Sequence, residues 1–127
     1  LERDLLSLLD QQWEAVRRFE LHKAASALKQ MGDVVNKYVD THEPWKLAKD
    51  PARSGDLDRV LLTMCRALRF LAGAMQPVMP VISSKILGAL GEAEPPRGRE
   101  FFSFGSLESG RVLGTLGPLF PRLEKEK

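Results

Sequence analysis

The sequence predicts an all-α protein, an antiparallel helix bundle that ends in an irregular C-terminal tail. Apolar residues recur at steps of four and three over long stretches, which is the period of one helix face. Prolines and glycines punctuate the chain between these stretches, so the helices are joined by short links. At 127 residues with 43% apolar content, the chain is long enough for one domain with a real core.

The first predicted helix covers about residues 1–18, and the second covers about residues 20–42. The apolar stripe of the first consists of Leu6, Leu9, Trp13 and Val16. The stripe of the second consists of Leu21, Ala25, Leu28, Gly32, Val35 and Val39. We expect both stripes to face the core, and Trp13 to belong to the core with them.

The third predicted helix begins after Ser54-Gly-Asp56, whose side chains can cap it, and Gln76-Pro77 closes it. Its stripe consists of Leu57, Leu61, Met64, Leu68, Leu71 and Met75. The fourth helix starts near Pro80, and we expect it to bury Ile82, Ile86 and Leu90. Residues 1–92 are therefore predicted to form the bundle, with these five residues buried: Leu28, Val35, Leu61, Met64 and Leu68.

Residues 93–127 are predicted to be a tail without regular structure, because Pro95-Pro96 and four later glycines interrupt any helix. Phe101, Phe102 and Phe104 lie in this tail. Exposed together, three aromatic rings would form a sticky patch. We therefore expect them to pack on the bundle or on a domain outside this sequence.

The link between the second and third helices carries the most informative residue. Glu43-Pro44 ends the second helix, since a proline biases the preceding residue away from the α region, and Trp45 follows at once. Residues 45–50 are predicted to form a short helical turn that holds Trp45 outward. A flat aromatic beside Lys46 and Lys49 can stack on an unpaired base while the lysines meet phosphate. The alternative is a tryptophan that plugs the corner and packs under the turn.

Charged and polar residues near this link fit nucleic acid as well. Residues 45–69 carry six basic side chains against three acidic ones, although many solvated helix faces look the same. Asn36 and Asp40 lie four residues apart and therefore share a helix face. An asparagine amide can donate and accept at a base edge, and an aspartate can accept from an exocyclic amine. The alternative is that Asp40 and Thr41 satisfy backbone groups at the helix end.

Several classes of function are excluded by what the sequence lacks. Cys65 is the only cysteine and there are two histidines, His22 and His42, so neither an internal disulfide nor a metal site is expected. No group of residues forms a recognisable catalytic centre, and no apolar run approaches the roughly 20 residues that span a bilayer. The chain opens without methionine, inside what reads as a helix, and we expect it to be a piece of a longer protein.

The motif Asn36-Lys-Tyr-Val-Asp, followed by Pro44-Trp45 and Leu47-Ala-Lys, resembles the signature of the anticodon-binding domain of methionyl-tRNA synthetase, of the bacterial and organellar kind. Residues 68–80 resemble the next helix of that family and its exit. Leu113-Gly114 and Pro118-Leu-Phe-Pro-Arg-Leu-Glu124 resemble its closing segment. The resemblance covers nearly all of the chain and is most specific at residues 36–49 and 118–124.

This resemblance implies a function in reading the tRNA anticodon. In the family the tryptophan of the Pro-Trp pair stacks in the anticodon pocket. An acidic residue at the position of Asp40 is linked to discrimination between anticodons. The family's pocket also uses an asparagine and an arginine from a preceding helix, which this sequence does not include. The implied anticodon-binding residues of this chain are Trp45, Asp40, Asn36, Lys37, Pro44 and Lys46.

The resemblance also implies what the whole enzyme does. Such an enzyme joins methionine to its initiator and elongator tRNAs, with ATP and Mg²⁺ held by a catalytic domain of the same chain. The class I motifs HIGH and KMSKS are missing here, so we expect no catalytic residue, metal or cofactor in this part. The family's tail folds back towards the catalytic domain, with Leu119 and Phe120 as anchors. We expect a cytoplasmic enzyme, or alternatively one of the mitochondrial or plastid matrix, without a membrane or DNA partner.

Two other readings of the sequence stay open. One is the anticodon domain of another class I synthetase, such as those for isoleucine, leucine or valine; Pro44-Trp45 and the Pro-Leu-Phe-Pro ending argue against it. The other is a non-enzymatic helical interaction module, in which Trp45 anchors a protein partner.

Overall fold

The computed structural model of the chain describes residues 1–91 and 99–102, and all regular structure within them is helical. The predicted all-α bundle is thereby confirmed. In chain order the elements are α1 (Glu2–Arg17), α2 (Leu21–His42), α3 (Pro44–Leu47), the 3₁₀ turn η1 (Pro51–Arg53), α4 (Ser54–Met75), α5 (Pro80–Ala89) and the 3₁₀ turn η2 (Arg99–Phe102). None of the described helices is long and apolar enough to cross a membrane.

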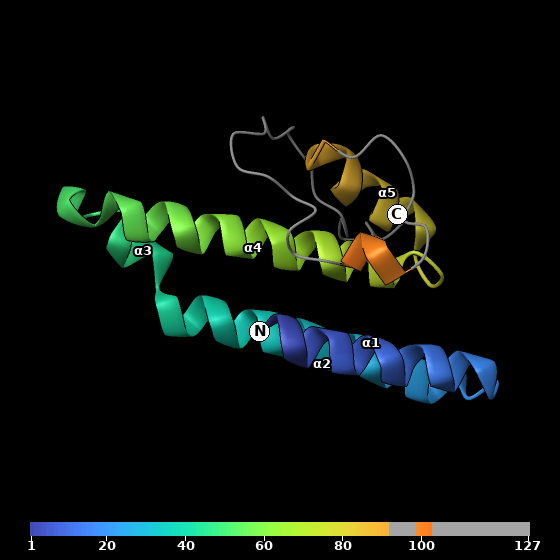
Figure 1. The fold of residues 1–127 in the computed structure, drawn as a ribbon. Coiled ribbons are helices and arrows are strands. Elements are labelled where there is room, and N and C mark those ends of the chain that lie inside the picture. The colour runs from blue at the N-terminus through green and yellow to red at the C-terminus, as the bar shows by residue number, and fades with distance from the viewer. Residues whose placement is uncertain (92–98, 103–127) are drawn as a thin grey trace, which may run out of the picture.

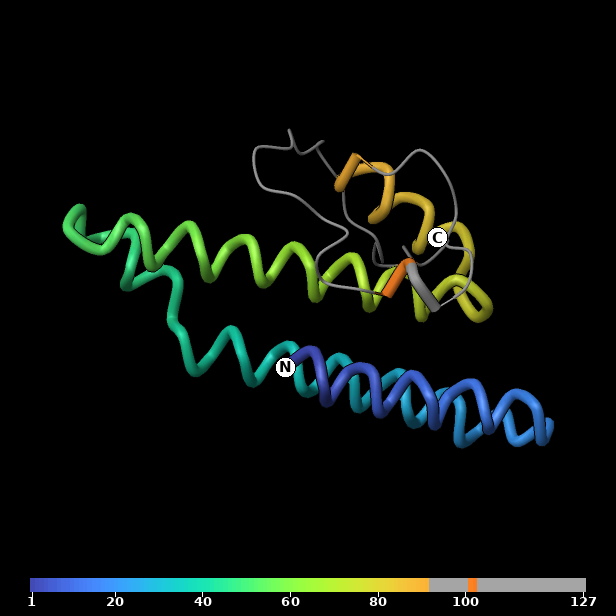
Figure 2. The backbone as a smooth tube through the Cα atoms, viewed as in Figure 1, coloured from blue at the N-terminus to red at the C-terminus, as the bar shows by residue number. Residues whose placement is uncertain are grey.

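The long helices lie side by side and alternate in direction. α1 and α2 form an antiparallel hairpin, α4 runs antiparallel to α2, and α5 folds back over the C-terminal half of α4 (Figures 1 and 2). α1 has 16 residues against 22 for both α2 and α4, and it starts midway along the bundle. The halves of α2 and α4 that adjoin α3 are therefore covered by fewer described neighbours than the other halves.

Small residues mark the places where the long helices touch. The described residues of α2 that are fully buried are Ala24, Ala27 and Met31, whereas Leu21 and Ala25 of the predicted stripe are exposed. In α1 the buried stripe is Leu5, Leu8, Leu9, Gln12 and Ala15. Alanines occupy the contact because a methyl group lets two helix backbones approach closely, and the larger side chains then fill the flanks. The buried face is thus displaced by about one residue from the stripe that the large side chains predict.

Two residues predicted to be buried are exposed, and that prediction was wrong for them. Leu61 is 43% exposed and Leu68 is 38% exposed, whereas Leu28, Val35 and Met64 are half-buried. Both leucines come directly after buried residues of α4, Leu61 after Val60 and Leu68 after Ala67. The four-three spacing gave the period of α4 but not its buried face, because no member of the predicted stripe is fully buried and the buried face lies about one residue earlier, as in α1 and α2.

The part of the tail that the structure describes packs on α4, as predicted for its aromatic residues. The Arg69 guanidinium lies 3.7 Å from the centre of the Phe101 ring, and its Nη1 donates a hydrogen bond to the Phe101 carbonyl. A side chain on Gly73 would place a Cβ 2.7 Å from the Phe101 ring, so only glycine leaves room for it. Phe104, Leu119 and Phe120 lie outside the described residues, and the domain boundary at residue 92 stays a prediction.

Phe102 joins the tail to the core of the bundle. Its side chain is 5% exposed, and its ring meets those of Phe70 and Trp13 edge-on, at centroid distances of 4.9 and 5.9 Å. Edge-to-face aromatic pairs of this kind stabilise beyond the area they bury. The predicted place of Trp13 in the core is consistent with this contact.

We expect Phe102→Ala to lower the free energy of unfolding of the 127-residue chain by about 3–5 kcal/mol, because it empties a ring-lined site in the core. Phe19→Ala is the matched control, since Phe19 is 89% exposed and its loss should change stability by less than about 0.5 kcal/mol. Denaturant titration of both variants measures the difference. Equal losses in the two variants would contradict the role assigned to Phe102.

Candidate nucleic-acid interface

Trp45 stands at one end of the bundle on a turn that is anchored from beneath. α3 is a single helical turn in which Pro44 and Leu47 are buried, while Trp45 is 50% exposed and Lys46 is exposed. Pro44 occupies the first helical turn, where a missing N–H costs nothing. The predicted outward tryptophan is confirmed, and the corner-plug alternative does not fit so exposed an indole.

Glu43 supplies the turn that places α3. Its backbone has φ 45° and ψ 62°, so it leaves the right-handed region as expected for a residue before proline, but it becomes left-handed rather than extended. Its amide donates to the Val39 carbonyl and its carbonyl accepts from the Lys46 amide, at 3.0 and 2.9 Å. This residue therefore closes α2 and starts α3 with no intervening loop.

The polar face at the end of α2 is open to a ligand. Asn36, Lys37 and Asp40 are all exposed, and no hydrogen bond or ion pair engages their side chains within the part of the chain that the structure describes. The helix-end alternative holds for Thr41, whose hydroxyl donates to the Lys37 carbonyl at 2.8 Å, but not for Asp40. Asn36 and Asp40 thus keep free amide and carboxylate groups one helical turn apart.

The cations near Trp45 differ in their availability. Lys46 Nζ lies 2.9 Å from Glu43 Oε1, in an exposed pair of the kind that contributes little to stability. Lys49 is exposed, and no described acidic group pairs with it. Lys49 is therefore free to bind a phosphate directly. Lys46 would first have to break its ion pair with Glu43.

A hollow of about 520 Å³ lies beside α3, between the end of α2 and the start of α4. Tyr38 and His42 line one side with stacked rings 4.0 Å apart, and Lys46, Arg53 and Arg59 line other parts of it. Arg53 pairs with Asp56 at 3.5 Å, but no described acidic group pairs with Arg59. The sequence indicated this region only through its local basic excess and did not single out Arg59, His42 or Tyr38.

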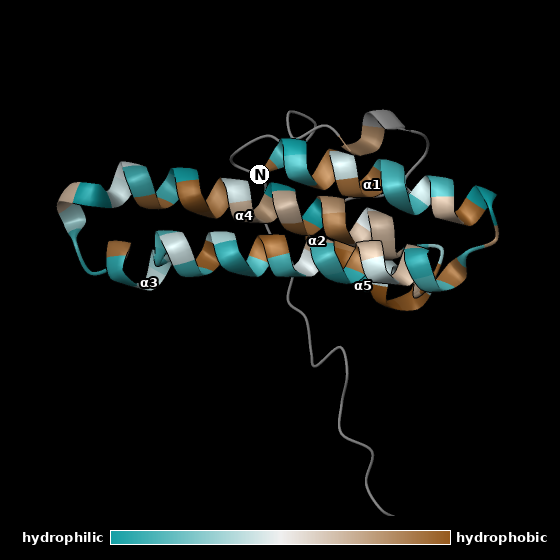
Figure 3. Cartoon of the chain, turned by 90° about the horizontal axis from the view of Figure 1, so that it is seen from below, coloured by the Kyte–Doolittle hydropathy of each residue, from teal (hydrophilic) through white to brown (hydrophobic). Residues whose placement is uncertain are grey.

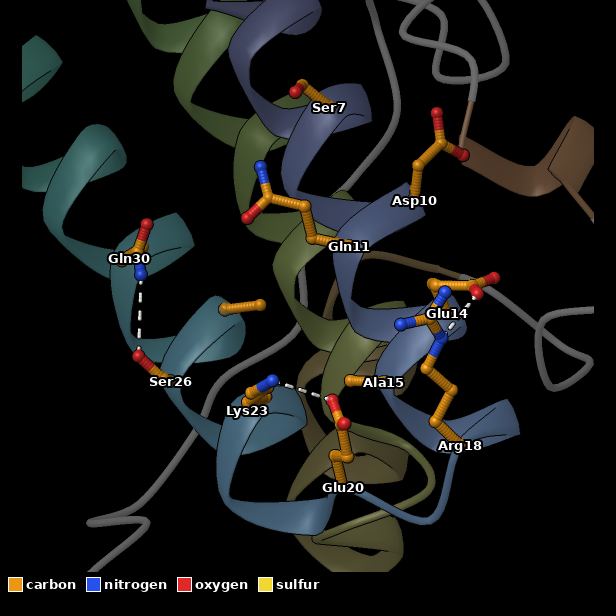
Figure 4. A pocket seen from close by; sticks show the side chains of 11 residues that line it. Ser7, Asp10, Gln11, Glu14, Ala15, Arg18, Glu20, Lys23, Ser26 and Gln30 are labelled. Atoms are coloured by element: carbon orange, nitrogen blue, oxygen red, sulfur yellow. Dashed lines mark hydrogen bonds and ion pairs between the residues drawn. The ribbon is translucent and has the colours of Figure 1, made fainter.

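A second hollow, of about 600 Å³, lies between α1 and α2 (Figure 4) and has a different character. Four of its five charged lining residues form two ion pairs: Arg18 pairs with Glu14 at 2.9 Å and Lys23 with Glu20 at 3.0 Å, while Asp10, the fifth, has a partner of its own. The hydrogen bond from Lys23 holds the pKa of Glu20 below its ordinary value. No unpaired charge converges on this groove, which gives it little to offer an ionic ligand.

No metal or reactive-thiol chemistry is indicated in the described part of the chain. Within it, no group of three histidine, cysteine or acidic side chains could hold a metal ion. Cys65 is half-buried and packs against a cluster made of Ala72 of α4 with Ile86 and Leu87 of α5 and Leu90. This burial raises the pKa of its thiol. A raised pKa keeps the thiol protonated and unreactive at neutral pH.

Comparisons with known proteins agree with this geometry. A family model described as the anticodon binding domain of methionyl tRNA ligase matches residues 1–127. The methionine–tRNA ligase of Enterococcus faecalis is 32% identical over 114 residues, which are 89% of this chain and 17% of that protein. The methionine–tRNA ligase of Bacillus subtilis is 34% identical over 116 residues, which are 90% of this chain and 17% of that protein.

Solved structures show the same fold. The apo form of Mycobacterium tuberculosis methionyl-tRNA synthetase aligns with a TM-score of 0.75 at 30% identity, over 98% of this chain and 26% of that one. The same enzyme in complex with methionyl-adenylate aligns with a TM-score of 0.69. This chain thus spans about a sixth of the length of the curated relatives it matches. With this fold, the exposed Trp45 and a family match over its whole length, the chain belongs to the family of anticodon-binding domains of methionyl-tRNA ligases.

Proposed function

We propose that this chain reads the anticodon of methionine tRNA for a methionine–tRNA ligase of which it is a part. The observation that carries the proposal is the exposure of Trp45 on a turn whose flanking residues Pro44 and Leu47 are buried. An indole held this way presents a flat face at little further loss of conformational entropy. Single-stranded RNA loops are recognised by stacking splayed bases on such rings and by hydrogen bonds to the base edges.

The neighbouring residues then take complementary roles. Asn36 and Asp40 lie on the open face of α2, from which an amide and a carboxylate can reach the edges of the unstacked bases. Lys37, Lys46 and Lys49 supply positive charge for the phosphates. Pro44 acts through position, because it starts the turn that carries Trp45.

The chemistry belongs to the remainder of the longer ligase. We propose that the remainder joins methionine to the initiator and elongator tRNAs through a methionyl-adenylate, with ATP and Mg²⁺, in the cytoplasm of a bacterium or in an organelle matrix. Supporting this are the relatives named methionine–tRNA ligase and the solved relative bound to methionyl-adenylate. The interaction-module alternative would use the same exposed Trp45 for a protein, and the tests below separate the two.

Trp45→Ala in the ligase should weaken binding of methionine tRNA by about ten- to hundredfold, because one base–aromatic stack contributes about 1–3 kcal/mol. Its melting temperature should change little, since half of the indole is already in solvent. Trp13→Ala is the matched control: Trp13 packs on Phe102 in the core, so that variant should lose stability instead. If the loss of stability in Trp45→Ala accounts for all of the lost binding, the stacking role is refuted.

Lys49→Gln should reduce the dependence of tRNA affinity on salt. Each phosphate contact with single-stranded nucleic acid contributes about 0.7 to the slope of log K against log salt concentration, and the variant should lose about that much. Lys23→Gln is the control, because Lys23 pairs with Glu20 near the start of α2, far from Trp45. Equal slopes for Lys49→Gln and the unaltered protein would show that Lys49 meets no phosphate.

Asp40→Asn should reduce the discrimination between correct and altered anticodons more than it reduces the affinity for methionine tRNA. The substitution preserves the size of the side chain but removes its negative charge and replaces one of its two accepting oxygens by a donor, so a hydrogen bond from a base amine becomes weaker. The measurement is the ratio of affinities for methionine tRNA and for the same tRNA with one anticodon base changed. That ratio should fall about tenfold, on the scale of one lost hydrogen bond to a charged group. A ratio that stays constant would remove Asp40 from the site.

A further inference from the structure

The hollow beside α3 carries one unmatched positive charge. It lies where the end of α2, α3, η1 and the start of α4 come together (Figure 1), and three lysine and arginine side chains line it against two acidic ones. Lys46 of α3 and Arg53 of η1 are paired with acidic neighbours, at 2.9 and 3.5 Å. Arg59 of α4 is exposed, and no described acidic group pairs with it. The guanidinium of Arg59 is therefore available to an anion.

The imidazole of His42 gives the same hollow a hydrogen-bond acceptor. His42 lines the hollow and is exposed, and its ring stacks on that of Tyr38 with centroids 4.0 Å apart. Its Nδ1 lies 3.0 Å from the Tyr38 carbonyl oxygen. Because a carbonyl only accepts hydrogen bonds, Nδ1 carries the proton of the neutral ring, and Nε2 keeps a lone pair. Nε2 of the neutral ring therefore accepts a hydrogen bond from a hydroxyl but donates none.

A free guanidinium and a fixed acceptor in one hollow match the sugar–phosphate of RNA. Arginine binds phosphate through parallel N–H···O hydrogen bonds, which its planar group presents together. A ribose 2′-hydroxyl can donate to an acceptor, and it is the group by which proteins distinguish RNA from DNA. In a ribonucleotide the 2′-hydroxyl and the 3′-phosphate sit on neighbouring carbons, so one nucleotide can present both. The volume of about 520 Å³ lies within the range of about 300–1,000 Å³ that is usual for ligand sites.

The position of the hollow links it to Trp45. Lys46 and Leu47 of α3 line it, and Trp45 comes directly before them on the same helical turn. Arg59 and three further residues of α4 form another wall, and Figure 3 shows hydrophilic colour at this start of α4. An RNA strand with one base stacked on Trp45 therefore has its adjoining nucleotide close to the hollow.

We infer that the hollow holds the sugar–phosphate of the nucleotide that adjoins the base on Trp45. Its phosphate binds Arg59, and its 2′-hydroxyl donates to His42 Nε2. This inference rests on the proposed function and adds to it a second contact site, with selectivity for RNA at one nucleotide. The hollow between α1 and α2 offers no such site, because the arginine and the lysine that line it are both paired.

Single 2′-deoxy substitutions test the contact with His42. Methionine tRNA is prepared with one 2′-deoxy nucleotide at each anticodon-loop position in turn, and its affinity for the full-length ligase is measured. One position should weaken binding by about three- to tenfold, the scale of one neutral hydrogen bond. That effect should disappear in His42→Phe, which keeps a ring to stack on Tyr38 but has no acceptor. It should persist in the control His22→Phe, because His22 is exposed at the start of α2.

The contact with Arg59 is tested on the all-ribose tRNA. Arg59→Gln in the full-length ligase should lower tRNA affinity by about tenfold or more, the scale of a hydrogen bond to a charged group. The slope of log K against log salt concentration should fall by about 0.7, as for one phosphate of a single strand. Arg17→Gln is the control, because Arg17 pairs with Glu14 on α1. All four replaced side chains are exposed, so the melting temperatures should stay the same.

The inference requires both results. An unchanged affinity and slope in Arg59→Gln overturns it, and so does the lack of any 2′-deoxy effect that depends on His42. Competition by inorganic phosphate distinguishes the source of the anion: if Arg59→Gln loses binding of inorganic phosphate but keeps its tRNA affinity, the hollow is a site for free anions and the inference is wrong. Failure of the proposed function looks different, because Trp45→Ala then leaves tRNA affinity unchanged.

Discussion

The reversal of the chain at Glu43 is the constraint on which the rest of the structure depends. α2 and α4 each have 22 residues and can pack antiparallel only if the chain turns back between them with little slack. A left-handed Glu43 followed by Pro44 begins that turn, and α3, through its buried Pro44 and Leu47, and then η1 lead the chain into α4. The same turn leaves Trp45 on the outside, so the geometry that closes the bundle also presents the aromatic ring.

Helix packing in this protein relies on small residues more than on its largest ones. Ala24 and Ala27 of α2 and Ala67 of α4 are almost completely buried, whereas several leucines of the apolar stripes stand on the flanks. Close contact at alanines fixes the distance between helices, and Phe70 and Phe102 then fill the remaining space. Gly73 likewise allows the tail to pack closely on α4, because the Phe101 ring occupies the space that a Cβ would take.

The two ends of the bundle differ in chemistry. The Trp45 end combines one exposed ring with free polar and cationic groups, which suits unpaired bases and phosphate. The opposite end combines apolar side chains with charges already paired to their neighbours, which suits a protein surface.

The sequence by itself determined the number and approximate bounds of the main helices and the stop at Pro44, whereas it left Trp45 either outward or packed under the turn until the structure showed it exposed. These features depend on local chemistry: apolar period, proline sterics and the residues next to them. Which face of each helix is buried was decided only by the tertiary structure. Leu61 and Leu68 each follow a buried residue of α4, Val60 and Ala67, and the apolar period alone did not show which of these adjacent faces the other helices cover. The pairing of α1 with the end of α4 likewise arises from contacts between residues some 60 positions apart, as in the Gln12–Ala74 hydrogen bond, which no local pattern encodes.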